Sequence, residues 1–217
     1  PMKTLVIIPS RMSATRLPGK PLLKVNGLSI ISHVFKKAEK ANIGEVIVAT
    51  EDQEIIDDVK KNGGRAILTK KQHQTGTDRI YEVLQRFNTS NIDLVMNLQG
   101  DEPLINVDDI RNLNNLMTKN NSKLGTLASK ILDEEIYGDQ NVVKVITKEN
   151  LNNSNFPEAT NFIRKILEKN KNIYHHLGIY CYQTETLKNF VSYSQSSNEV
   201  QNRLEQLRAL DNGIKIN

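Results

Sequence analysis

The sequence of 217 residues contains no tryptophan, one cysteine and only 5% aromatic residues, and these shortages exclude several classes of protein. A lone cysteine, Cys181, cannot form an internal disulfide framework and is typical of a reducing compartment. Because Cys181 lies in an apolar stretch, we expect a buried and inert thiol. So few aromatic side chains provide no stacking platform for single-stranded nucleic acid, and the basic residues are spread along the chain. We therefore expect no nucleic-acid partner.

Long apolar runs are also missing. No stretch approaches the roughly 20 residues that cross a bilayer, and the first residues lack the charged, apolar and cleavage regions of a signal peptide. We therefore expect a cytoplasmic protein without membrane insertion. The length suits one sizeable core better than two. We predict a single domain over residues 1–217, with a small lobe or excursion around residues 148–200.

Negative charge is absent from one segment in particular. Residues 8–27 contain no aspartate or glutamate, and three cations, Arg11, Arg16 and Lys20, lie close together within them. Arginine grips phosphate oxygens with two hydrogen bonds, lysine acts as a point charge, and loop amides add donors. The loop therefore suits a polyphosphate, although a basic loop can equally do no more than solvate a surface. It is not a P-loop, because Pro21 follows Lys20 where that motif requires serine or threonine.

The basic loop begins where a strand is predicted to end. Residues 4–8 form a short apolar run typical of a buried strand, and residues 30–41 carry apolar side chains on one helical face. Open α/β sheets bind ligands at the carboxyl ends of their strands, which is where this loop starts. The position therefore favours a ligand site over a plain surface loop.

The next segments continue an alternation of strands and helices. Strands are predicted over residues 45–50 and 65–69, with a helix over residues 51–62 that Thr50 and Gln53 would begin as a capping box. This order predicts a doubly wound, Rossmann-like α/β fold. No G-x-G-x-x-G follows the first strand, so the dinucleotide-binding fingerprint is absent.

Two further polar loops follow predicted elements. Residues 73–79, His-Gln-Thr-Gly-Thr-Asp-Arg, open onto a helix and could offer free amides to an anion, although alone they predict only a well-capped helix. The apolar strand of residues 92–98 runs into Gln99-Gly100-Asp101-Glu102-Pro103. Mg²⁺ takes one or two carboxylates plus phosphates and waters, so Asp101 is a candidate ligand. Turns of the Gly-Asp type are common, and the isolated motif is a weak signal.

Periodicity predicts the elements of the second half: a helix over residues 107–120, strands over residues 124–132, 142–147 and 174–182, and a last helix over residues 200–212. We expect the last helix to bury Val200 and to carry Glu205 with Arg208 as an ordinary exposed pair. We expect Lys144 to be exposed or to have a packing role.

The paired histidines of the strand over residues 174–182 invite a metal site. Adjacent residues of a strand point to opposite faces, so His175 and His176 would not converge on one ion, and no further histidine or cysteine suits a zinc site. On the residues alone, His176 could be a site residue or a hydrogen-bonded strand residue.

The polar loops occur in the order found in a known family. Residues 8–22, IPSRMSATRLPGKPL, resemble the signature loop of the sugar nucleotidyltransferases, in particular of the cytidylyltransferases that activate acidic sugars such as 3-deoxy-manno-octulosonate (Kdo). Further stretches resemble the same family's H-x-S-G-T-[DE]-R, N-x-Q-G-D-E-P, H-x-G-I-Y-A-Y and L-E-Q-L-R motifs, at residues 73–79, 97–103, 176–182 and 204–208. The resemblance covers nearly the whole chain.

The resemblance implies a Rossmann-like three-layer nucleotidyltransferase fold with a mixed, mainly parallel sheet. It implies a transferase that moves CMP from CTP to the anomeric hydroxyl of Kdo for lipopolysaccharide biosynthesis, acting as a homodimer with magnesium as the cofactor. The implied CTP-binding residues are Arg11, Ser13, Arg16, Lys20, Thr75 and Gly76. Lys20, Arg11 and Asp101 would be catalytic, and Asp101 would bind Mg²⁺. The implied Kdo-binding residues are Arg79, Gln99, His176, Tyr180, Glu205 and Gln206.

The sequence departs from the family pattern in two places. The F-S-R-S-x-I-P run, whose arginine helps to hold the sugar acid, is absent, and Phe162-Ile163-Arg164 is a poor substitute. Family members also continue into a V-D-T-P-E-D motif with a second metal-binding aspartate, beyond the position of Asn217. We expect metal binding and turnover to be impaired in a chain that lacks this aspartate.

Three other hypotheses stay open at this level. The chain could be a cytidylyltransferase for another acidic sugar or for a polyol phosphate. It could be a non-catalytic nucleotide-binding module that keeps the fold. It could also be an interaction domain in which every motif is a loop or a cap.

Overall fold

The computed structural model describes residues 2–13, 17–70, 72–87, 91–101, 103–166 and 172–217. Its main feature is an eight-stranded sheet with the order β5-β4-β1-β6-β10-β8-β9, in which β7 also pairs with β10. The strands are β1 (Thr4–Pro9), β4 (Gly44–Thr50), β5 (Ala66–Leu68), β6 (Leu94–Asn97), β7 (Leu124–Ser129), β8 (Lys144–Thr147), β9 (Ala159–Ile163) and β10 (Ile173–Gln183). The short strands β2 (Lys24–Val25) and β3 (Leu28–Ser29) form a separate hairpin.

The sheet is mixed and mainly parallel, which confirms the predicted fold class. β1 pairs in parallel with β4 and β6, and β4 with β5. β10 is antiparallel to β6, β7 and β8, and β9 is antiparallel to β8. Six strands therefore run in one direction, and β9 and β10 run in the other.

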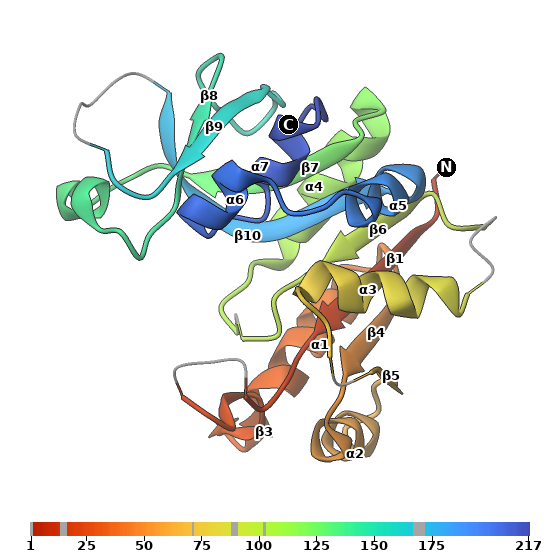
Figure 1. The fold of residues 1–217 in the computed structure, drawn as a ribbon. Helices are drawn as coiled ribbons and strands as arrows, with labels where there is room; N and C mark the ends of the chain where they lie inside the picture. The colour runs from red at the N-terminus through yellow and green to blue at the C-terminus, as the bar shows by residue number, and fades with distance from the viewer. Residues whose placement is uncertain (1, 14–16, 71, 88–90, 102, 167–171) are drawn as a thin grey trace.

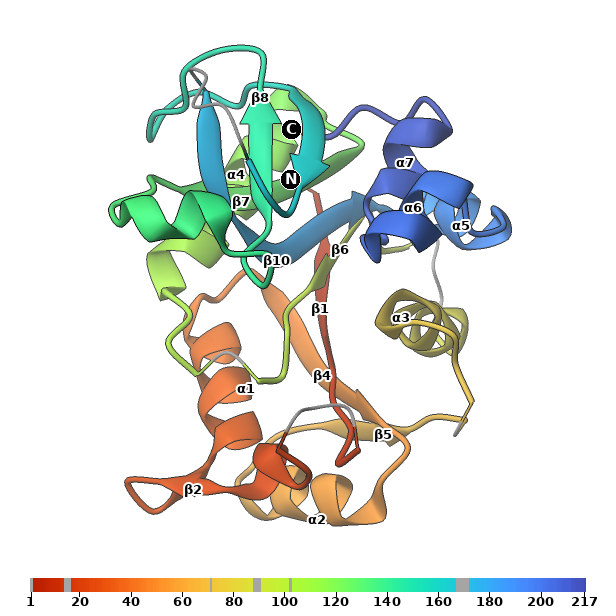
Figure 2. The ribbon, with the colours of Figure 1, turned by 60° about the vertical axis from the view of Figure 1, so that its left-hand side comes forward.

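Helices cover both faces of the sheet and make three layers. The long helices are α1 (Ile30–Lys40), α2 (Gln53–Lys61), α3 (Gly76–Gln85), α4 (Val107–Asn120) and α5 (Thr184–Ser192), and the short ones are α6 (Ser197–Asn202) and α7 (Leu207–Asp211). The 3₁₀ turns η1 (Lys20–Leu22) and η3 (Glu134–Gly138) lie in connections. Figure 1 shows the whole arrangement, and Figure 2 shows α1 and α4 on one side of the strands and α3 and α5 on the other.

The alternation of β1 shows how the sequence specifies these layers. Val6 and Ile8 belong to a core cluster with residues of α1, α2 and α4, whereas Leu5 and Ile7 belong to a second cluster with residues of α3 and α5. Successive side chains of a strand point to opposite faces, so a strand buried on both sides reads as a continuous apolar run. All four side chains are buried.

The first half of the chain agrees with the sequence predictions except at one helix start. The predicted capping box between Thr50 and Gln53 is wrong. α2 begins at Gln53 after Asp52, and the Thr50 hydroxyl instead accepts a hydrogen bond from the Asp52 amide at 3.1 Å. The threonine side chain thus closes a local turn ahead of the helix, and Asp52 takes the N-cap position.

Two predictions in the second half are wrong. The last helix is not continuous over residues 200–212, because Arg203 adopts the left-handed conformation with φ 55° and separates α6 from α7. Val200 is 57% exposed rather than buried. Lys144 has the packing role, one of its two expected alternatives: it is fully buried, and its ammonium group donates to the carbonyls of Asp139 and Arg164.

None of the helices in the described part of the chain combines the length and apolarity that crossing a bilayer requires.

Candidate functional site

The polar loops that follow β1 and β6 meet the start of α3 at one edge of the sheet. There they line a cavity of about 190 Å³, which we call the basic cavity. Its lining is Pro9, Ser10, Arg11, His73, Gln74, Thr75, Gly76, Arg79 and Gln99. No acidic side chain is among the described residues that line it, so the cavity suits an anion.

Two hydrogen bonds fix the start of the first loop. The Ser10 amide donates to the carbonyl of Ala49 at 3.0 Å, and the Met12 amide donates to the carboxylate of Asp52 at 2.8 Å. These bonds tie the start of the loop to the end of β4. The backbone beside Arg11 is therefore held in place while the Arg11 side chain stays exposed.

A close approach of two loops builds the floor of the site. A Cβ atom on Gly100 would lie 2.9 Å from the Pro9 carbonyl oxygen and 3.2 Å from the Cδ1 of Ile31. Cβ atoms almost never lie so near a backbone oxygen, so only glycine lets the loop after β6 pack against the loop after β1. This contact brings Gln99 next to Ser10 and Arg11 in the same cavity.

The start of α3 supplies the opposite wall of the basic cavity. Thr75 caps the helix by accepting a hydrogen bond from the Asp78 amide at 3.3 Å, and Gly76 is the first helical residue. The first amides of a helix carry partial positive charge and favour anions. Gly76 also lines the second cavity described below.

Arg79 lies one turn into α3 and is 3% exposed. Its guanidinium donates to the Thr69 hydroxyl and, at 3.0 Å, to the carbonyl of Lys70, and it lies 3.8 Å from the carboxylate of Glu51. Burial lowers the pKa of Arg79, and Glu51 opposes that shift. The side chain lines the basic cavity and is partly committed to holding residues 69–70.

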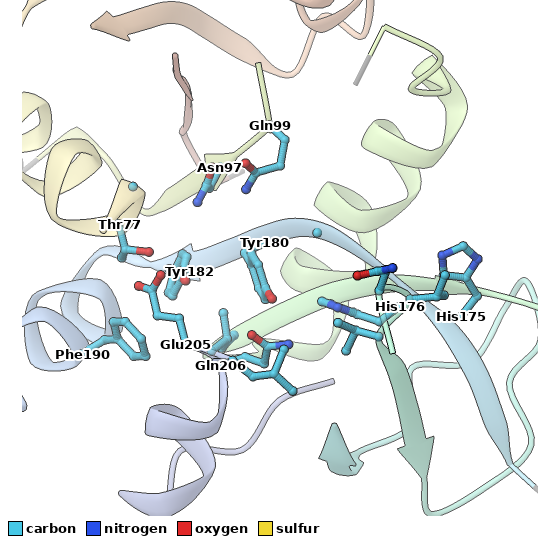
Figure 3. Close-up of a pocket in the computed structure, with 17 residues that line it drawn as sticks. Thr77, Asn97, Gln99, His175, His176, Tyr180, Tyr182, Phe190, Glu205 and Gln206 are labelled. Carbon is cyan, nitrogen blue, oxygen red and sulfur yellow. The ribbon is translucent and has the colours of Figure 1, made fainter. Parts of the chain in front are cut away.

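A second cavity of about 450 Å³, the polar cavity, lies on the β10 side of Gln99 (Figure 3). The described residues that line it include neither lysine nor arginine, and many of them are hydrogen-bonding side chains. These polar residues are Thr77, Asn97, Gln99, Asn141, His175, His176, Tyr180, Tyr182, Glu205 and Gln206. Gly76 and Gln99 line both cavities, so the two cavities adjoin.

Two buried oxygen atoms of the polar cavity have no hydrogen-bond partner: Oδ1 of Asn97 and Oε1 of Glu205. Oγ of Ser10, in the basic cavity, is also buried without a hydrogen-bond partner. Buried polar atoms are almost always paired in folded proteins, so each of these marks a place where a ligand can supply the missing partner.

His176 lies in β10 at a point where the pairing with β7 changes register, between Leu177 and Tyr180. Its Nε2 is 2.9 Å from the Thr126 hydroxyl, which lies 2.6 Å from the carbonyl oxygen of Ile179. The hydroxyl donates to that carbonyl, so the imidazole Nε2–H donates to the hydroxyl and Nδ1 is left as an acceptor. Burial, with a smaller contribution from His175, lowers the pKa of His176 to about 3. The ring is therefore neutral near pH 7.

Glu205 and Gln206 lie in the connection between α6 and α7, and both face the polar cavity (Figure 3). The predicted exposed pair of Glu205 with Arg208 is wrong, because Arg208 is buried and its guanidinium binds the carboxylate of Glu199 at 2.7 Å. Burial raises the pKa of Glu205, against the effects of a hydrogen bond from Thr77 and the charge of Arg208. Burial also raises the pKa of Tyr180, whose hydroxyl stays a donor.

The structure places the predicted CTP-binding and metal-binding residues in two groups. Arg11, Thr75 and Gly76 line the basic cavity. Ser13 is exposed, Lys20 is half-buried in η1 and Asp101 is half-buried after β6, and none of the three is in the described lining of either cavity. Arg16 lies outside the described residues.

Five of the six predicted sugar-binding residues line the polar cavity: Gln99, His176, Tyr180, Glu205 and Gln206. Arg79 lines the basic cavity instead. Sequence reasoning missed Thr77, Asn97 and Tyr182, although each lies inside one of the motifs that carried the resemblance. Phe190 also lines the polar cavity, and its place in an ordinary amphipathic helix gave no signal.

A doubly wound sheet with a basic cavity at the carboxyl ends of its strands is the architecture of a nucleotide-binding α/β protein. Residues 5–216 match the family model described as cytidylyltransferase. The chain is 42% identical to the 3-deoxy-manno-octulosonate cytidylyltransferase of Thermodesulfovibrio yellowstonii, across 99% of this chain and 89% of that protein. It is 43% identical to the protein of the same name from Nitrobacter winogradskyi, across 99% and 84%.

A solved structure agrees with these similarities. The structure of CMP:2-keto-3-deoxy-manno-octonic acid synthetase complexed with CTP matches this chain with a TM-score of 0.88 and 35% identity, over 99% of this chain and 88% of the other. The chain belongs to the cytidylyltransferase family.

The packing of Gly100 gives a first prediction. Gly100→Ala should destabilise the fold by about 1–3 kcal/mol, because the added methyl group forces the loops after β1 and β6 apart. Urea unfolding measures this change. Gly138→Ala is the matched control, since nothing lies within 4 Å of the place its methyl group would take and φ is not positive. Equal stability of the two variants would contradict the proposed close approach.

The low pKa of His176 gives a second prediction. The unfolded state takes up a proton near pH 6.5, whereas the folded state does so near pH 3. The neutral ring therefore contributes stability that is complete above pH 6.5 and is lost as the pH falls towards 3, by up to about 5 kcal/mol. His176→Gln should remove this part of the pH dependence. The free energy of unfolding from pH 8 to pH 4 measures it, and parallel curves for the two proteins would count against the assignment.

Proposed function

We propose that this protein transfers CMP from CTP to the anomeric hydroxyl of Kdo and releases pyrophosphate. The observation that carries the proposal is the pair of adjoining cavities, one basic and one lined by hydrogen-bonding side chains, which share Gly76 and Gln99. A nucleotide in the first would lie against a sugar in the second. The names of relatives that are 42% and 43% identical over nearly the whole chain support CTP and Kdo as the two substrates.

The triphosphate would occupy the basic cavity. Arg11 can grip phosphate oxygens with its planar guanidinium, and the first amides of α3 at Gly76 add donors. The unpaired Oγ of buried Ser10 can also bond the nucleotide. We propose that Lys20, together with Ser13 and Arg16, acts on the phosphates from the remainder of the same loop.

The sugar would occupy the polar cavity. Glu205 Oε1 and His176 Nδ1 are acceptors for sugar hydroxyls, whereas Gln99, Gln206 and the Tyr180 hydroxyl can donate. Sugars are recognised by many such groups at fixed positions, which suits a lining that the fold holds in place. We propose that Arg79, next to Gln99 in the adjoining cavity, faces the carboxylate of the sugar acid.

The chemical step is an in-line displacement. The anomeric oxygen of Kdo forms a bond to the α-phosphorus of CTP, the bond from that phosphorus to the bridging oxygen breaks, pyrophosphate leaves with the electron pair, and the hydroxyl proton is released. Such transfers depend on positioning and on charge neutralisation more than on covalent catalysis. Arg11 and Lys20 would supply the positive charge, and Gln99 would hold the sugar against the nucleotide.

The donor set fits Mg²⁺ in one particular way. Asp101 offers a carboxylate at the end of β6, and the nucleotide brings phosphate oxygens, a combination that Mg²⁺ prefers. No cluster of three metal-ligating side chains occurs in the described residues, so Asp101 and the nucleotide together would hold the ion. Bound there, Mg²⁺ would offset the negative charge of the phosphates.

We further propose a homodimer, a cytoplasmic location and a role for the product in lipopolysaccharide biosynthesis, all from the resemblance to the family. The buried thiol of Cys181 is consistent with a reducing compartment. Leu104 and Leu132 are 88% and 91% exposed, and a second copy of the chain could cover such apolar surface.

Pyrophosphate release tests the proposed reaction. The protein is given CTP and Mg²⁺ with Kdo, with a sialic acid or with polyol phosphates in parallel wells. We expect pyrophosphate release only in the wells that contain Kdo as the acceptor. The hydrogen-bonding side chains of the polar cavity lie at fixed positions and match one arrangement of sugar hydroxyls. Pyrophosphate release with another acceptor would identify that compound, and not Kdo, as the substrate. CTP binding without release in any well would identify a non-catalytic binding module.

Lys20→Ala tests the role of the first loop. We expect turnover to fall about 100-fold or more, as on removal of one preorganised group that stabilises transition-state charge. Lys24→Ala is the matched control, since Lys24 is an exposed lysine four residues further along the chain. Turnover of Lys20→Ala within about threefold of the wild type would show that the loop assignment is wrong.

A further inference from the structure

Glu205 and Gln206 reach the polar cavity from a break between two short helices. α6 ends at Asn202, Arg203 turns the chain with φ 55°, and α7 begins at Leu207. A non-glycine residue in the left-handed region is strained, so other contacts must hold the break in place. The position of both sugar-facing side chains depends on those contacts.

A buried ion pair joins the two helices across the break. Arg208 of α7 donates from Nε to Glu199 Oε1 at 2.9 Å and from its terminal nitrogen to Oε2 at 2.7 Å. Both side chains are almost fully buried. Glu199 Oε1 also accepts from the Ser196 amide at 2.9 Å, as part of the capping box that begins α6. The pair therefore fixes the start of α6 to the start of α7.

Arg208 also contacts the wall of the cavity. Its guanidinium carbon lies 4.7 Å from the centre of the Phe190 ring, and Phe190 lines the polar cavity. The backbone amide of Arg208 donates to the carbonyl of Glu205 at 3.0 Å. The side chain of Arg208 thus bonds Glu199 of α6 and packs on the Phe190 ring, and its backbone amide bonds the turn that carries Glu205.

We propose that Arg208 is a positioning residue of the polar cavity, whose two-pronged bond to Glu199 holds the break that presents Glu205 and Gln206 to the sugar. This inference rests on the proposed function, since the ligand of the polar cavity is the sugar substrate. Arg208 is not in the described lining of either cavity. It would act through the residues that it holds, Glu205, Gln206 and Phe190.

The charges around Glu205 allow the role of Arg208 to be measured through the pKa of Glu205. Burial favours its neutral form most, a hydrogen bond from Thr77 and the charge of Arg208 favour the carboxylate, and Asp78 and Glu199 add smaller effects that favour the neutral form. The phenols of Tyr180 and Tyr182 also face it. Loss of Arg208 should therefore raise the pKa of Glu205 further, and a protonated Glu205 is a poorer acceptor for a sugar hydroxyl.

The test uses Arg208→Met and a double variant, Glu199→Gln with Arg208→Met. Removing one partner of a buried pair can prevent folding, whereas removing both charges is tolerated better, and glutamine keeps the capping-box acceptor. Arg65→Met is the control, because Arg65 pairs with Glu45 in an exposed ion pair away from both cavities. Arg208→Lys keeps the charge and loses the two-pronged geometry.

Steady-state kinetics separate the two substrates. We expect the KM for Kdo to rise about tenfold or more in Arg208→Met and in the double variant, while the KM for CTP and the CTP-induced thermal shift stay within about twofold of the wild type. The acid limb of kcat/KM for Kdo should move to higher pH in Arg208→Met. It should move less in the double variant, which loses one charge of each sign, and least in Arg208→Lys. Arg65→Met should match the wild type throughout.

A substrate-free measurement keeps the inference separate from the proposed function. Carbon-13 NMR of labelled glutamate carboxyls, with Glu205 assigned through Glu205→Gln, should show a higher pKa for Glu205 in Arg208→Met than in the wild type. If the wild type released no pyrophosphate with CTP and Kdo, the proposed function would be overturned. The change in the pKa of Glu205 would still support the positioning role of Arg208. A folded variant with an unmoved Glu205 titration and unchanged KM for Kdo would overturn the inference, as would an equal loss of affinity for CTP.

Discussion

The parallel pairing of β1 with β6 is the constraint on which the rest of the site depends. It brings the ends of two strands to the same edge of the sheet, although the strands are far apart in sequence. Gly100 then allows the following loops to pack within contact distance of the Pro9 carbonyl. Without that approach Gln99 would not adjoin Arg11, and the basic and polar cavities would not share a wall.

Polar and charged side chains are buried at several places in the fold. Glu199 with Arg208, Lys144 and His176 are all almost fully buried, and each has its partners within the chain. Buried charges and polar groups add little net stability compared with apolar side chains, but they fix geometry when every partner is present. Asn97 and Glu205 are the exceptions, since each keeps one buried oxygen unpaired in the polar cavity. Oγ of Ser10, Oδ1 of Asn97 and Oε1 of Glu205 are thus unpaired where their residues line a cavity, whereas Oδ1 of Asn172 is unpaired outside both cavities.

Much of the fold could be predicted from sequence because the sheet is buried on both faces. The apolar runs of β1, β4 and β6 and the amphipathic pattern of α4 placed those elements within one or two residues. The resemblance placed most of the sugar-facing residues, because four of its motifs contribute residues to the polar cavity. What periodicity could not show was the break at Arg203, since Leu204 and Leu207 are both buried at a spacing that a continuous helix would also give.

The wrong pairing predicted for Glu205 and the unforeseen partners of Lys144 have the same physical origin. A spacing of three residues predicts a local pair, whereas Arg208 finds Glu199 across the break, at a sequence distance that a helical pattern does not include. Lys144 is buried because Asp139 and Arg164 turn their carbonyl oxygens towards it, and backbone acceptors leave no trace in a sequence. Side-chain partners set by tertiary contacts are therefore the part of the site that only the structure supplies.

The central claim is that the two adjoining cavities hold the nucleotide and the sugar acid against each other. A crystal structure with CTP and a Kdo analogue that lacks the anomeric hydroxyl tests it most directly. We expect the triphosphate beside Arg11 and the start of α3, and the sugar between Gln99, Tyr180 and Gln206. A sugar bound outside the polar cavity, or a triphosphate away from the basic cavity, would contradict the account.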